Sequence, residues 1–296
     1  MLPLESVPNF SEGRDHLVIA DIGTELARFA KLLDVHTDAD HNRSVYTFAG
    51  DEEQIVDALL AGIAVAQKRI DLREHGGVHP RIGAVDVVPV VAIRREDAEL
   101  ARETARIAAQ RIGEELGLPV FLYGEVGEER GPAFFRRGGP EELQRRIDAG
   151  ELAPDFGPRQ LHPSAGGVIV GARRPLIAFN VNLVHADVEA ARAIARTIRE
   201  RDGGFPGVRA LGLGLPRAGH AQISMNVEDW EAAALHDIVA AIEREAAARG
   251  VELAGAELVG LMPAGAAVAA AGALLRIHGF DASHVLELRL LDQTVE

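Results

Sequence analysis

The sequence of 296 residues contains no cysteine, which excludes disulfide bonds, thiolate nucleophiles, iron–sulfur clusters and cysteine-ligated zinc. Aromatic residues make up only 4%, so alanine, leucine and valine must fill most of the core. No stretch approaches the roughly 18 consecutive apolar residues of a membrane-spanning helix, and the N-terminus lacks the basic start and apolar run of a signal peptide. These absences predict a soluble, cytoplasmic protein that enters no membrane.

Basic residues are also in deficit, with 31 Lys and Arg against 45 Asp and Glu and a formal net charge of −14. A uniformly basic nucleic-acid-binding face is therefore not expected, although a local basic pocket is compatible with this charge. Hydrophobic residues at 47% and charged residues at 26% are typical of a globular chain, and the length fits one large or two ordinary domains.

The first half of the chain alternates strand-like and helical stretches. Apolar residues recur with helical spacing between Arg14 and Ala30, and the β-branched run Gly83–Ile93 is typical of a buried strand. The predicted strands are Ser6–Phe10, Lys31–His36, Ser44–Ala49, Gly83–Ile93 and Val120–Tyr123, and the predicted helices are Arg14–Ala30, Gly50–Leu72 and Glu96–Leu116. The order βαββαβ, followed by one more helix and strand, is ferredoxin-like.

The second half repeats this order without visible sequence similarity to the first. Its predicted strands are Ile177–Leu183, Val208–Leu215, His220–Asn226 and Ala256–Leu261, and its predicted helices are Asp187–Arg201, Asp229–Arg249 and Ala264–Ile277. The irregular stretch Gly124–Gly167, with one short helix near Glu141–Ala149, is typical of a linker or a binding loop. We therefore predict an α/β fold of two ferredoxin-like βαββαβ layers, domains 1–174 and 175–296, which form a sandwich pair with a ligand cleft between them.

The stretch REHGGVHPRIG (73–83) carries a candidate catalytic histidine. Gly76 and Gly77 interrupt a helix, so His75 and His79 are not a zinc-binding pair on one helical face. His79 lies on a loop that Pro80 restrains, directly before a buried strand, where an imidazole with an ordinary pKa near 6.5 suits proton transfer. From these residues alone, a surface histidine in a glycine-rich turn is the simpler interpretation.

Three further patterns each have a functional and a plain interpretation. Asp34, His36, Asp38 and Asp40 would share one face of an extended strand beside His41, as a cation site or as a polar hairpin; no metal is expected, because no ligand geometry is specified. SAGGVIVGAR (164–173) has glycines that let backbone approach a flat or anionic ligand, or is a turn into a strand. Asparagines at the ends of predicted strands line a cleft or simply end the strands, namely Asn9, Asn180, Asn182 and Asn226.

Taken together, these stretches resemble the glutamate formimidoyltransferase family, the formiminotransferase part of the bifunctional formiminotransferase–cyclodeaminases, in its stand-alone form. The resemblance covers nearly the whole chain, in the same order. It is carried by VPNFSEG (7–13), LLDV…NRSVYTFAG (32–50), HPRIGAVDVVPV (79–90), LPVFLYGE (118–125), PDFGP (154–158), GARRPLIAFNVNL (171–183), AQISMN (221–226) and ELVGL (257–261).

The resemblance implies transfer of the formimidoyl group from N-formimidoyl-L-glutamate to N5 of tetrahydrofolate in histidine degradation. Tetrahydrofolate would be a co-substrate, and the partners would be these small molecules, in a homodimer. His79 matches the family's catalytic histidine in HPR, and Ser164–Arg173 matches its folate-binding stretch. We expect His79 to act as general acid and base, with Asp34 and Asp38 facing the amidinium charge. The expected substrate-binding residues are Asn9, Arg43, Arg81, Ser164, Gly166, Gly167, Gly171, Arg173, Asn180 and Asn182.

Two departures from the family pattern leave alternatives open. His36 stands where the family has an acid, and Ala165 where it often has an aromatic residue, so Phe156 or Tyr123 is expected to stack on the pterin instead. The alternatives are a paralogue that uses another one-carbon donor, such as an N-formyl compound, and a non-catalytic folate-binding protein. A metal-dependent hydrolase built on Asp34–His41 is a weaker one.

Overall fold

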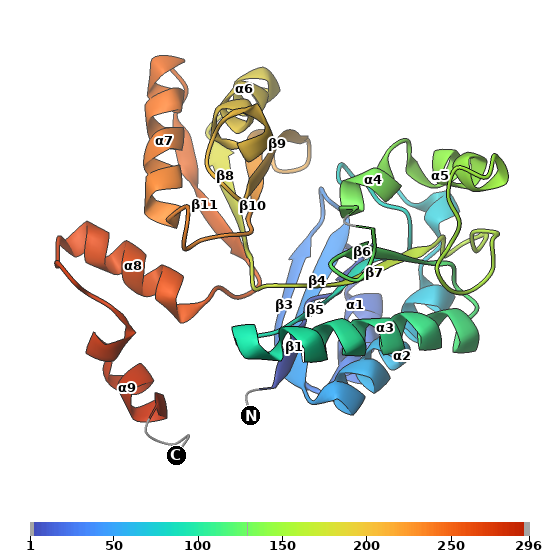
Figure 1. Ribbon diagram of the computed structural model, residues 1–296. Coiled ribbons are helices and arrows are strands. Elements are labelled where there is room, and N and C mark those ends of the chain that lie inside the picture. Colours follow the sequence, from blue (N-terminus) through green and yellow to red (C-terminus); the bar gives the residue numbers. More distant parts are fainter. Residues whose placement is uncertain (1–2, 129, 293–296) are drawn as a thin grey trace. The chain divides into compact units, whose positions relative to one another are not determined.

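The computed structural model describes residues 3–128 and 130–292, with no side-chain description from residue 290 onward. The chain divides into two compact units, which we call unit 1 (Met1–Arg174) and unit 2 (Pro175–Glu296). Figure 1 shows that each unit has its own sheet and its own helices. None of the helices in the described ranges is both long enough and apolar enough to cross a lipid bilayer.

Unit 1 is built on a seven-stranded sheet. Its strands are β1 (Leu4–Ser6), β2 (Asn9–Phe10), β3 (Lys31–Asp38), β4 (Arg43–Gly50), β5 (Val85–Val91), β6 (Val120–Gly124) and β7 (Val168–Arg173). Its helices are α1 (His16–Ala27), α2 (Glu52–Arg69), α3 (Ala98–Glu115), α4 (Pro132–Arg136) and α5 (Gly139–Asp148), with short 3₁₀ turns at Leu72–Glu74 and Arg95–Asp97.

The strand order of unit 1 is a ferredoxin-like sheet with an extension. β1 and β2 both pair with β4 and β5, so they act as one interrupted central strand, and β3 pairs with β4 at one edge. On the other side β7 lies parallel to β5, and β6 lies parallel to β7. The extra strands therefore lengthen the sheet beyond the βαββαβ core and place β7 between β5 and β6.

Helices cover both faces of this sheet. α2 begins with a capping box between Asp51 and Gln54 and buries an apolar stripe that includes Ile55, Leu59 and Ile63 in the main core. α4 and α5 contribute Phe135 and other apolar residues to a second core on β6 and β7. The sheet is thus packed on both faces by buried apolar residues.

Unit 2 has a four-stranded antiparallel sheet in the order β11-β8-β10-β9. Its strands are β8 (Ile177–Leu183), β9 (Val208–Leu215), β10 (His220–Val227) and β11 (Leu253–Val259). Its helices are α6 (Val188–Ile198), α7 (Leu235–Ala248), α8 (Ala264–Leu275) and α9 (Leu286–Asp292), with 3₁₀ turns at Glu200–Asp202 and Ala282–His284. The chain order β8-α6-β9-β10-α7-β11 with this strand order is ferredoxin-like.

The prediction of an α/β fold with two subdomains is confirmed, and the prediction of a ligand cleft between the layers stays a prediction. Some local predictions were wrong. α7 begins at Leu235 and not at Asp229, β11 begins at Leu253 and not at Ala256, and the short helices α4 and α9 were not predicted. The ends differ because local residues define the first and last residues of an element weakly.

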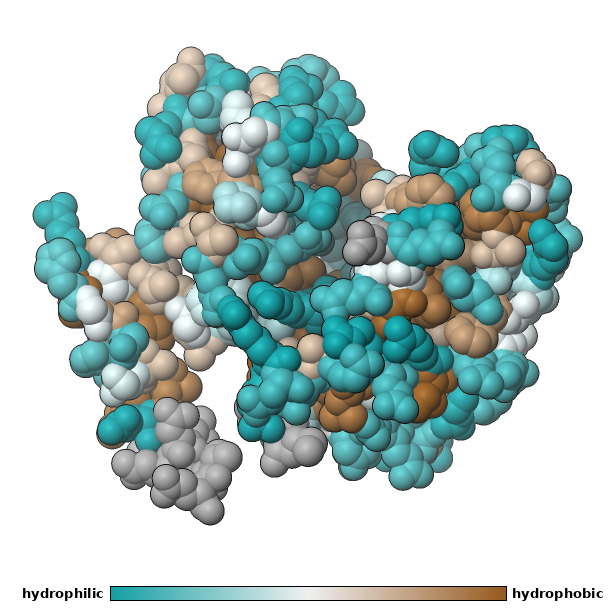
Figure 2. Space-filling view, viewed as in Figure 1, coloured by the Kyte–Doolittle hydropathy of each residue, from teal (hydrophilic) through white to brown (hydrophobic). Residues whose placement is uncertain are grey.

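Helix α8 is apolar on every side, and part of it is exposed. Leu274 has 83% of its surface accessible, and Leu275 is also exposed, as is Ile277 just after the helix. Figure 2 shows brown and tan atoms over this segment, at the left of the view. A helix that is apolar all round is ordinarily covered on most sides.

Candidate functional site

The loop that carries His79 packs against the turn between β3 and β4. The backbone nitrogen of Val78 donates to Asp40 O (3.1 Å), and Asn42 Nδ2 donates to Gly76 O (3.1 Å). Asn42 has a positive φ of 47°, which asparagine tolerates better than most residues. A Cβ on Gly77 would lie 2.3 Å from His41 O, so only glycine permits this close approach. Two segments about 35 residues apart in sequence are thereby held together.

The Nδ1 atom of His79 has two close neighbours of opposite kind. Arg43 Nη1 lies 2.6 Å from it and Pro80 O lies 2.7 Å from it. A guanidinium can only donate, and a carbonyl can only accept, so Nδ1 bonds to one of them at a time. Both of these neighbours lie at Nδ1, so the other ring nitrogen, Nε2, is the one that remains for a ligand.

A buried carboxylate holds Arg43. Asp86 is 1% exposed, and its Oδ2 lies 3.2 Å from Arg43 Nη1 and 2.6 Å from Arg136 Nη2. Asp86 Oδ1 accepts from the backbone nitrogen of Ile82 (2.9 Å). Arg43 Nε also donates to Asn9 Oδ1 (2.8 Å). The charge of Asp86 is thus shared by two guanidinium groups, one of which touches the imidazole.

Arg81 ties the loop to the turn from the other side. Its Nη2 donates to His41 O (2.6 Å), and its Nη1 donates to Asn42 O (3.0 Å). The same Nη1 lies 2.9 Å from His75 Nδ1. In this structure Arg81 is therefore a structural clamp on the loop as well as a cation beside it.

The electrostatics favour neutral imidazoles. Burial, followed by the charges of Arg43 and Arg136, holds the pKa of His79 well below its usual 6.5. Burial and the charge of Arg81 lower the pKa of His75 to about 4. Burial also lowers the pKa of Arg43 to about 9, against the opposing attraction of Asp86. At neutral pH the site therefore holds an uncharged His79 beside charged guanidinium groups.

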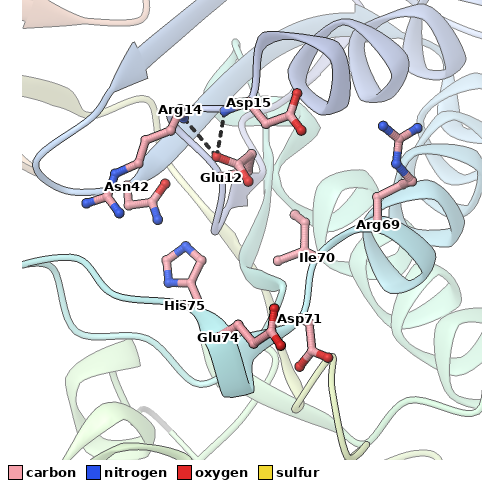
Figure 3. Close-up of a pocket in the computed structure, with 9 residues that line it drawn as sticks. All are labelled: Glu12, Arg14, Asp15, Asn42, Arg69, Ile70, Asp71, Glu74 and His75. Carbon is pink, nitrogen blue, oxygen red and sulfur yellow. Dashed lines mark hydrogen bonds between the residues drawn. The ribbon is translucent and has the colours of Figure 1, made fainter.

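A hollow of about 250 Å³ opens next to this loop (Figure 3). Asn42 and His75 line it and also bond to the His79 loop or to Arg81, whereas His79 itself does not line it. Glu12 Oε1 accepts from the backbone nitrogens of Arg14 and Asp15, as the dashed lines show. The other lining residues are Arg69, Ile70, Asp71 and Glu74. The hollow thus carries more carboxylates than cations.

The two predicted catalytic aspartates lie on β3. Asp34, His36 and Asp38 project on one face of this strand, as the alternation requires. Asp38 Oδ1 accepts from the backbone nitrogen of His41 (2.7 Å), and the His41 ring centre lies 5.8 Å from that of His79. Asp34 lies about 13 Å further along the strand, at roughly 3.3 Å per residue. Asp38 is therefore connected to the His79 loop through His41, whereas Asp34 is remote along the strand.

Most of the predicted folate-binding stretch is a strand. Residues Val168–Arg173 form β7, which is buried between β5 and β6. Gly166 pairs with Gly83 near the entrance of β5, while Arg173 pairs with Val91 at its exit. These ends are therefore separated by most of the strand length, about 20 Å. Of the two interpretations of Ser164–Arg173, the turn into a strand describes its backbone, because the apolar run VIV completes the parallel sheet. Folate binding by this stretch stays a prediction.

The glycines of this stretch have packing roles. A Cβ on Gly171 would lie 2.5 Å from the Tyr123 ring, and one on Gly167 would lie 3.1 Å from the Phe121 ring. Ser164 is at the start, where its carbonyl accepts from Leu72 N (2.8 Å). Arg173, at the far end, donates to the carbonyl of Arg174. Only the Ser164–Gly167 end lies near the entrance of β5, which follows the His79 loop.

The aromatic residues expected to stack on a pterin are committed to packing. Tyr123 is 7% exposed in the second core, and Phe156 packs on the main core. Ala165 is buried as well, and its nitrogen donates to His162 Nδ1 (3.0 Å). The expectation that Tyr123 supplies an open stacking surface was wrong, because that ring fills the space over Gly171.

Asn180 and Asn182 belong to unit 2 and lie on its sheet. Asn180 Nδ2 donates to Glu257 Oε2 (3.3 Å), and Asn182 Oδ1 accepts from Gln222 Nε2 (2.9 Å). Of the predicted residues, the structure thus gathers Asn9, Arg43, His79 and Arg81 in one cluster of unit 1. Among the residues that the structure describes, no group of three or more histidine or carboxylate side chains is arranged to hold a metal ion.

Asp86 and Arg136 were missed by sequence reasoning. A signal for Asp86 was present, because a single charge inside the run GAVDVVPVVAI must find a partner once the strand is buried. Arg136 gives no such signal, since it follows two phenylalanines in a stretch that the sequence predicts to be irregular. Its pairing with Asp86 depends on α4 packing over the sheet.

Comparison with known proteins agrees along nearly the whole chain. Residues 3–173 match the family model of the N-terminal subdomain of the formiminotransferase domain, and residues 178–281 match that of the formiminotransferase domain. The chain is 38% identical over 294 residues to glutamate formimidoyltransferase of Streptococcus pyogenes, which covers 97% of this chain and 98% of the relative.

Two other relatives have different lengths. The glutamate formimidoyltransferase of Thermoplasma acidophilum is 40% identical over 294 residues, covering 97% of each chain. The formimidoyltransferase-cyclodeaminase of Sus scrofa is 40% identical over 272 residues, covering 88% of this chain but 50% of the relative. The resemblance seen in the sequence is confirmed. The two glutamate formimidoyltransferases match this chain over nearly their whole length, whereas the formimidoyltransferase-cyclodeaminase matches it over half of its length.

Proposed function

This chain belongs to the formiminotransferase family and is a formimidoyltransferase, and on that premise we propose that it moves the formimidoyl group of N-formimidoyl-L-glutamate to N5 of tetrahydrofolate. The products are L-glutamate and 5-formimidoyltetrahydrofolate. Tetrahydrofolate is thus a substrate of this reaction. The observation that carries the chemical proposal is the imidazole of His79, whose Nδ1 is held between Arg43 and Pro80.

The reaction needs a proton to leave one nitrogen and arrive at another. N5 of tetrahydrofolate attacks the formimidoyl carbon and forms a tetrahedral intermediate, and N5 then carries a surplus proton. The glutamate nitrogen must gain a proton before its bond to carbon breaks, because an amide anion is a poor leaving group. Nε2 of His79 takes the first proton and supplies the second, which contributes about 10²–10⁴-fold.

The two neighbours of Nδ1 correspond to two forms of the ring. When Nδ1 accepts from Arg43, the proton of the neutral ring is on Nε2, and Nε2 cannot act as a base. When Nδ1 carries the proton and donates it to Pro80 O, Nε2 has a free lone pair. A substrate carboxylate that pairs with Arg43 draws the guanidinium away from Nδ1 and favours the second form. Substrate binding thereby prepares the base.

The charges around His79 favour both the uptake and the release of the proton by its imidazole. A neutral ring is a competent proton acceptor at pH 7, and its low pKa means that the proton is readily passed on. Once a carboxylate neutralises Arg43, the imidazolium is less opposed, so the pKa rises when the proton has to be taken up. Arg81 contributes a second cation, although it keeps its clamp on the turn.

The roles proposed for the carboxylates are unequal. Asp38 is joined to the site through His41 and is the better placed of the two to face the amidinium charge of the intermediate. Asp34 would need a ligand that extends along β3. Asn9 positions Arg43 through its Oδ1. Asn180 and Asn182 are also proposed as substrate-binding residues.

The test is turnover by the purified chain with tetrahydrofolate and either N-formimidoyl-L-glutamate or N-formyl-L-glutamate, followed by glutamate release and the mass of the folate product. We expect turnover with the formimidoyl donor. Turnover with the formyl donor alone would identify a paralogue with a different one-carbon donor. Tight binding of tetrahydrofolate with no turnover on either donor would identify a non-catalytic folate-binding protein, and either outcome contradicts the proposal.

A further inference from the structure

One face of the sheet of unit 2 packs against helices, and the opposite face is polar on two of its strands, β8 and β10. Val181 and Ile223 point to the face that α6 and α7 pack against. The alternation of a strand places the even-numbered residues of β8 and β10 on the opposite face, where the register sets them side by side. On β8 and β10 this face, which we call the polar face, carries Asn180, Asn182, His220, Gln222 and Ser224. The register places Leu211, Leu213 and Leu215 of β9 beside them.

Gln222 is the buried centre of that face. It is 1% exposed, and its amide nitrogen donates to Asn182 Oδ1 at 2.9 Å. This bond uses the donor end of the amide and fixes the orientation of the side chain. Its carbonyl oxygen Oε1 is buried and has no hydrogen-bond partner among the described residues. Buried polar atoms almost always have a partner, so an oriented and unpaired acceptor points to a ligand.

His220 repeats this observation two residues earlier on the same strand. Its Nε2 is buried and also has no hydrogen-bond partner in the described part of the chain. Residues two apart on a strand share a face and are separated by about 7 Å. Two unpartnered atoms, an acceptor oxygen and an imidazole nitrogen, thus belong to side chains that share the polar face.

We propose that Gln222 Oε1, together with His220 Nε2 on the same face, binds the N–H donors of an amidine-type N–C–N edge of a substrate. The inference rests on the proposed function, whose two substrates both contain such an edge. One is the formimidoyl group itself, and the other is the aminopyrimidinone ring of the folate pterin. Neither atom forms or breaks a bond in the reaction, so both act in binding.

The test is Gln222→Leu, which keeps the bulk and removes the acceptor. Asn182 is only partly buried, so water can replace the lost amide donor and the fold is expected to persist. The matched control is Gln110→Leu, which removes an exposed amide that bonds to Glu114 on α3. The readouts are the two KM values, each measured with the other substrate saturating, together with calorimetric binding of each compound alone.

We expect one KM to rise roughly 10-fold in Gln222→Leu, the effect of one lost hydrogen bond to a ligand, with no change in the control. A rise in the KM of N-formimidoyl-L-glutamate assigns the site to the donor, and a rise in that of tetrahydrofolate assigns it to the pterin. Unchanged KM values and unchanged calorimetric affinities overturn the inference.

Two further outcomes, a variant that does not fold and a wild-type chain without turnover, can be told apart from failure of the inference. If Gln222→Leu does not fold, His220→Phe takes its place, because a ring of similar size is retained; the same KM and calorimetric measurements then support or overturn the inference in the same way. If the wild-type chain shows no turnover at all, the proposed function fails. Calorimetry of the two compounds on wild type and on Gln222→Leu then decides the binding site by itself.

Discussion

Arg43 and His79 come from segments 36 residues apart, and they meet with 2.6 Å between Nη1 and Nδ1. The contact is a donor facing a nitrogen that can be either donor or acceptor, so it constrains which ring nitrogen carries the proton. Behind it, Asp86 holds Arg43 in place. Four expected outcomes follow from this arrangement and from the packing that supports it.

Replacing the imidazole should remove turnover and leave the fold. In His79→Gln we expect kcat to fall about 10²–10⁴-fold, since no group remains to shuttle the proton between N5 and the glutamate nitrogen. The thermal midpoint should stay within a few degrees, because a partly buried loop residue with a disfavoured charge adds little stability. Steady-state kinetics and circular dichroism melting measure the two. A kcat within twofold of wild type rules out the role of His79.

Removing the neighbouring cation should change the pH profile. The wild-type pKa of His79 is held below 6.5, so the acidic limb of kcat/KM should fall below pH 6.5. In Arg43→Gln one positive charge is gone, the imidazolium is less disfavoured, and the limb should move up toward 6.5. The exposed Arg28→Gln, which loses a pair with Glu25 and a contact with the Phe29 ring, is the control and should not move it. An unmoved limb in Arg43→Gln would mean that Arg43 does not tune His79.

Asp86 should be needed for stability as well as for position. In Asp86→Asn two guanidinium groups lose their shared buried counter-ion, and breaking such a pair costs about 3–5 kcal/mol. We expect a large drop in the urea midpoint of unfolding. Asp148→Asn, at an exposed end of α5 where the carboxylate accepts from Gln144, should change it by less than about 0.5 kcal/mol. A urea midpoint of Asp86→Asn that falls as little as that of Asp148→Asn would contradict a stabilising role of the Asp86 ion pairs.

Substitution by alanine should lower the stability of the fold at one glycine near His79 and leave it unchanged at another. A Cβ on Gly83 would lie 1.9 Å from Gly167 O, a backbone atom that cannot move without disturbing β7, so Gly83→Ala should cost about 1–3 kcal/mol or more. A Cβ on Gly76 would meet nothing within 4 Å, so Gly76→Ala should be nearly neutral. Denaturant titration of both variants checks this. A neutral Gly83→Ala would contradict the close approach of the β5 entrance to β7.

The sequence could predict those features of the site that depend on residues close together in the chain. Pro80 and the paired glycines mark a loop, the β-branched run after them marks a buried strand, and together they place His79 at a rigid strand entrance. The resemblance to a known family then singled out this histidine. The lone charge of Asp86 in that strand was readable in the same way, but its partners were not.

What the tertiary structure decided is which distant residues meet. The register of β4 beside β2 brings Arg43 to Asn9, and the helix α4 brings Arg136 to Asp86. The same sheet takes up most of SAGGVIVGAR as the buried strand β7, so the two ends of the stretch lie far apart. Periodicity and turn residues act over a few positions and are legible in sequence, whereas strand order and register come from burying all the apolar faces at once. The local sequence was therefore enough to identify His79 as the candidate imidazole, whereas the charged residues around it could be found only from the tertiary structure.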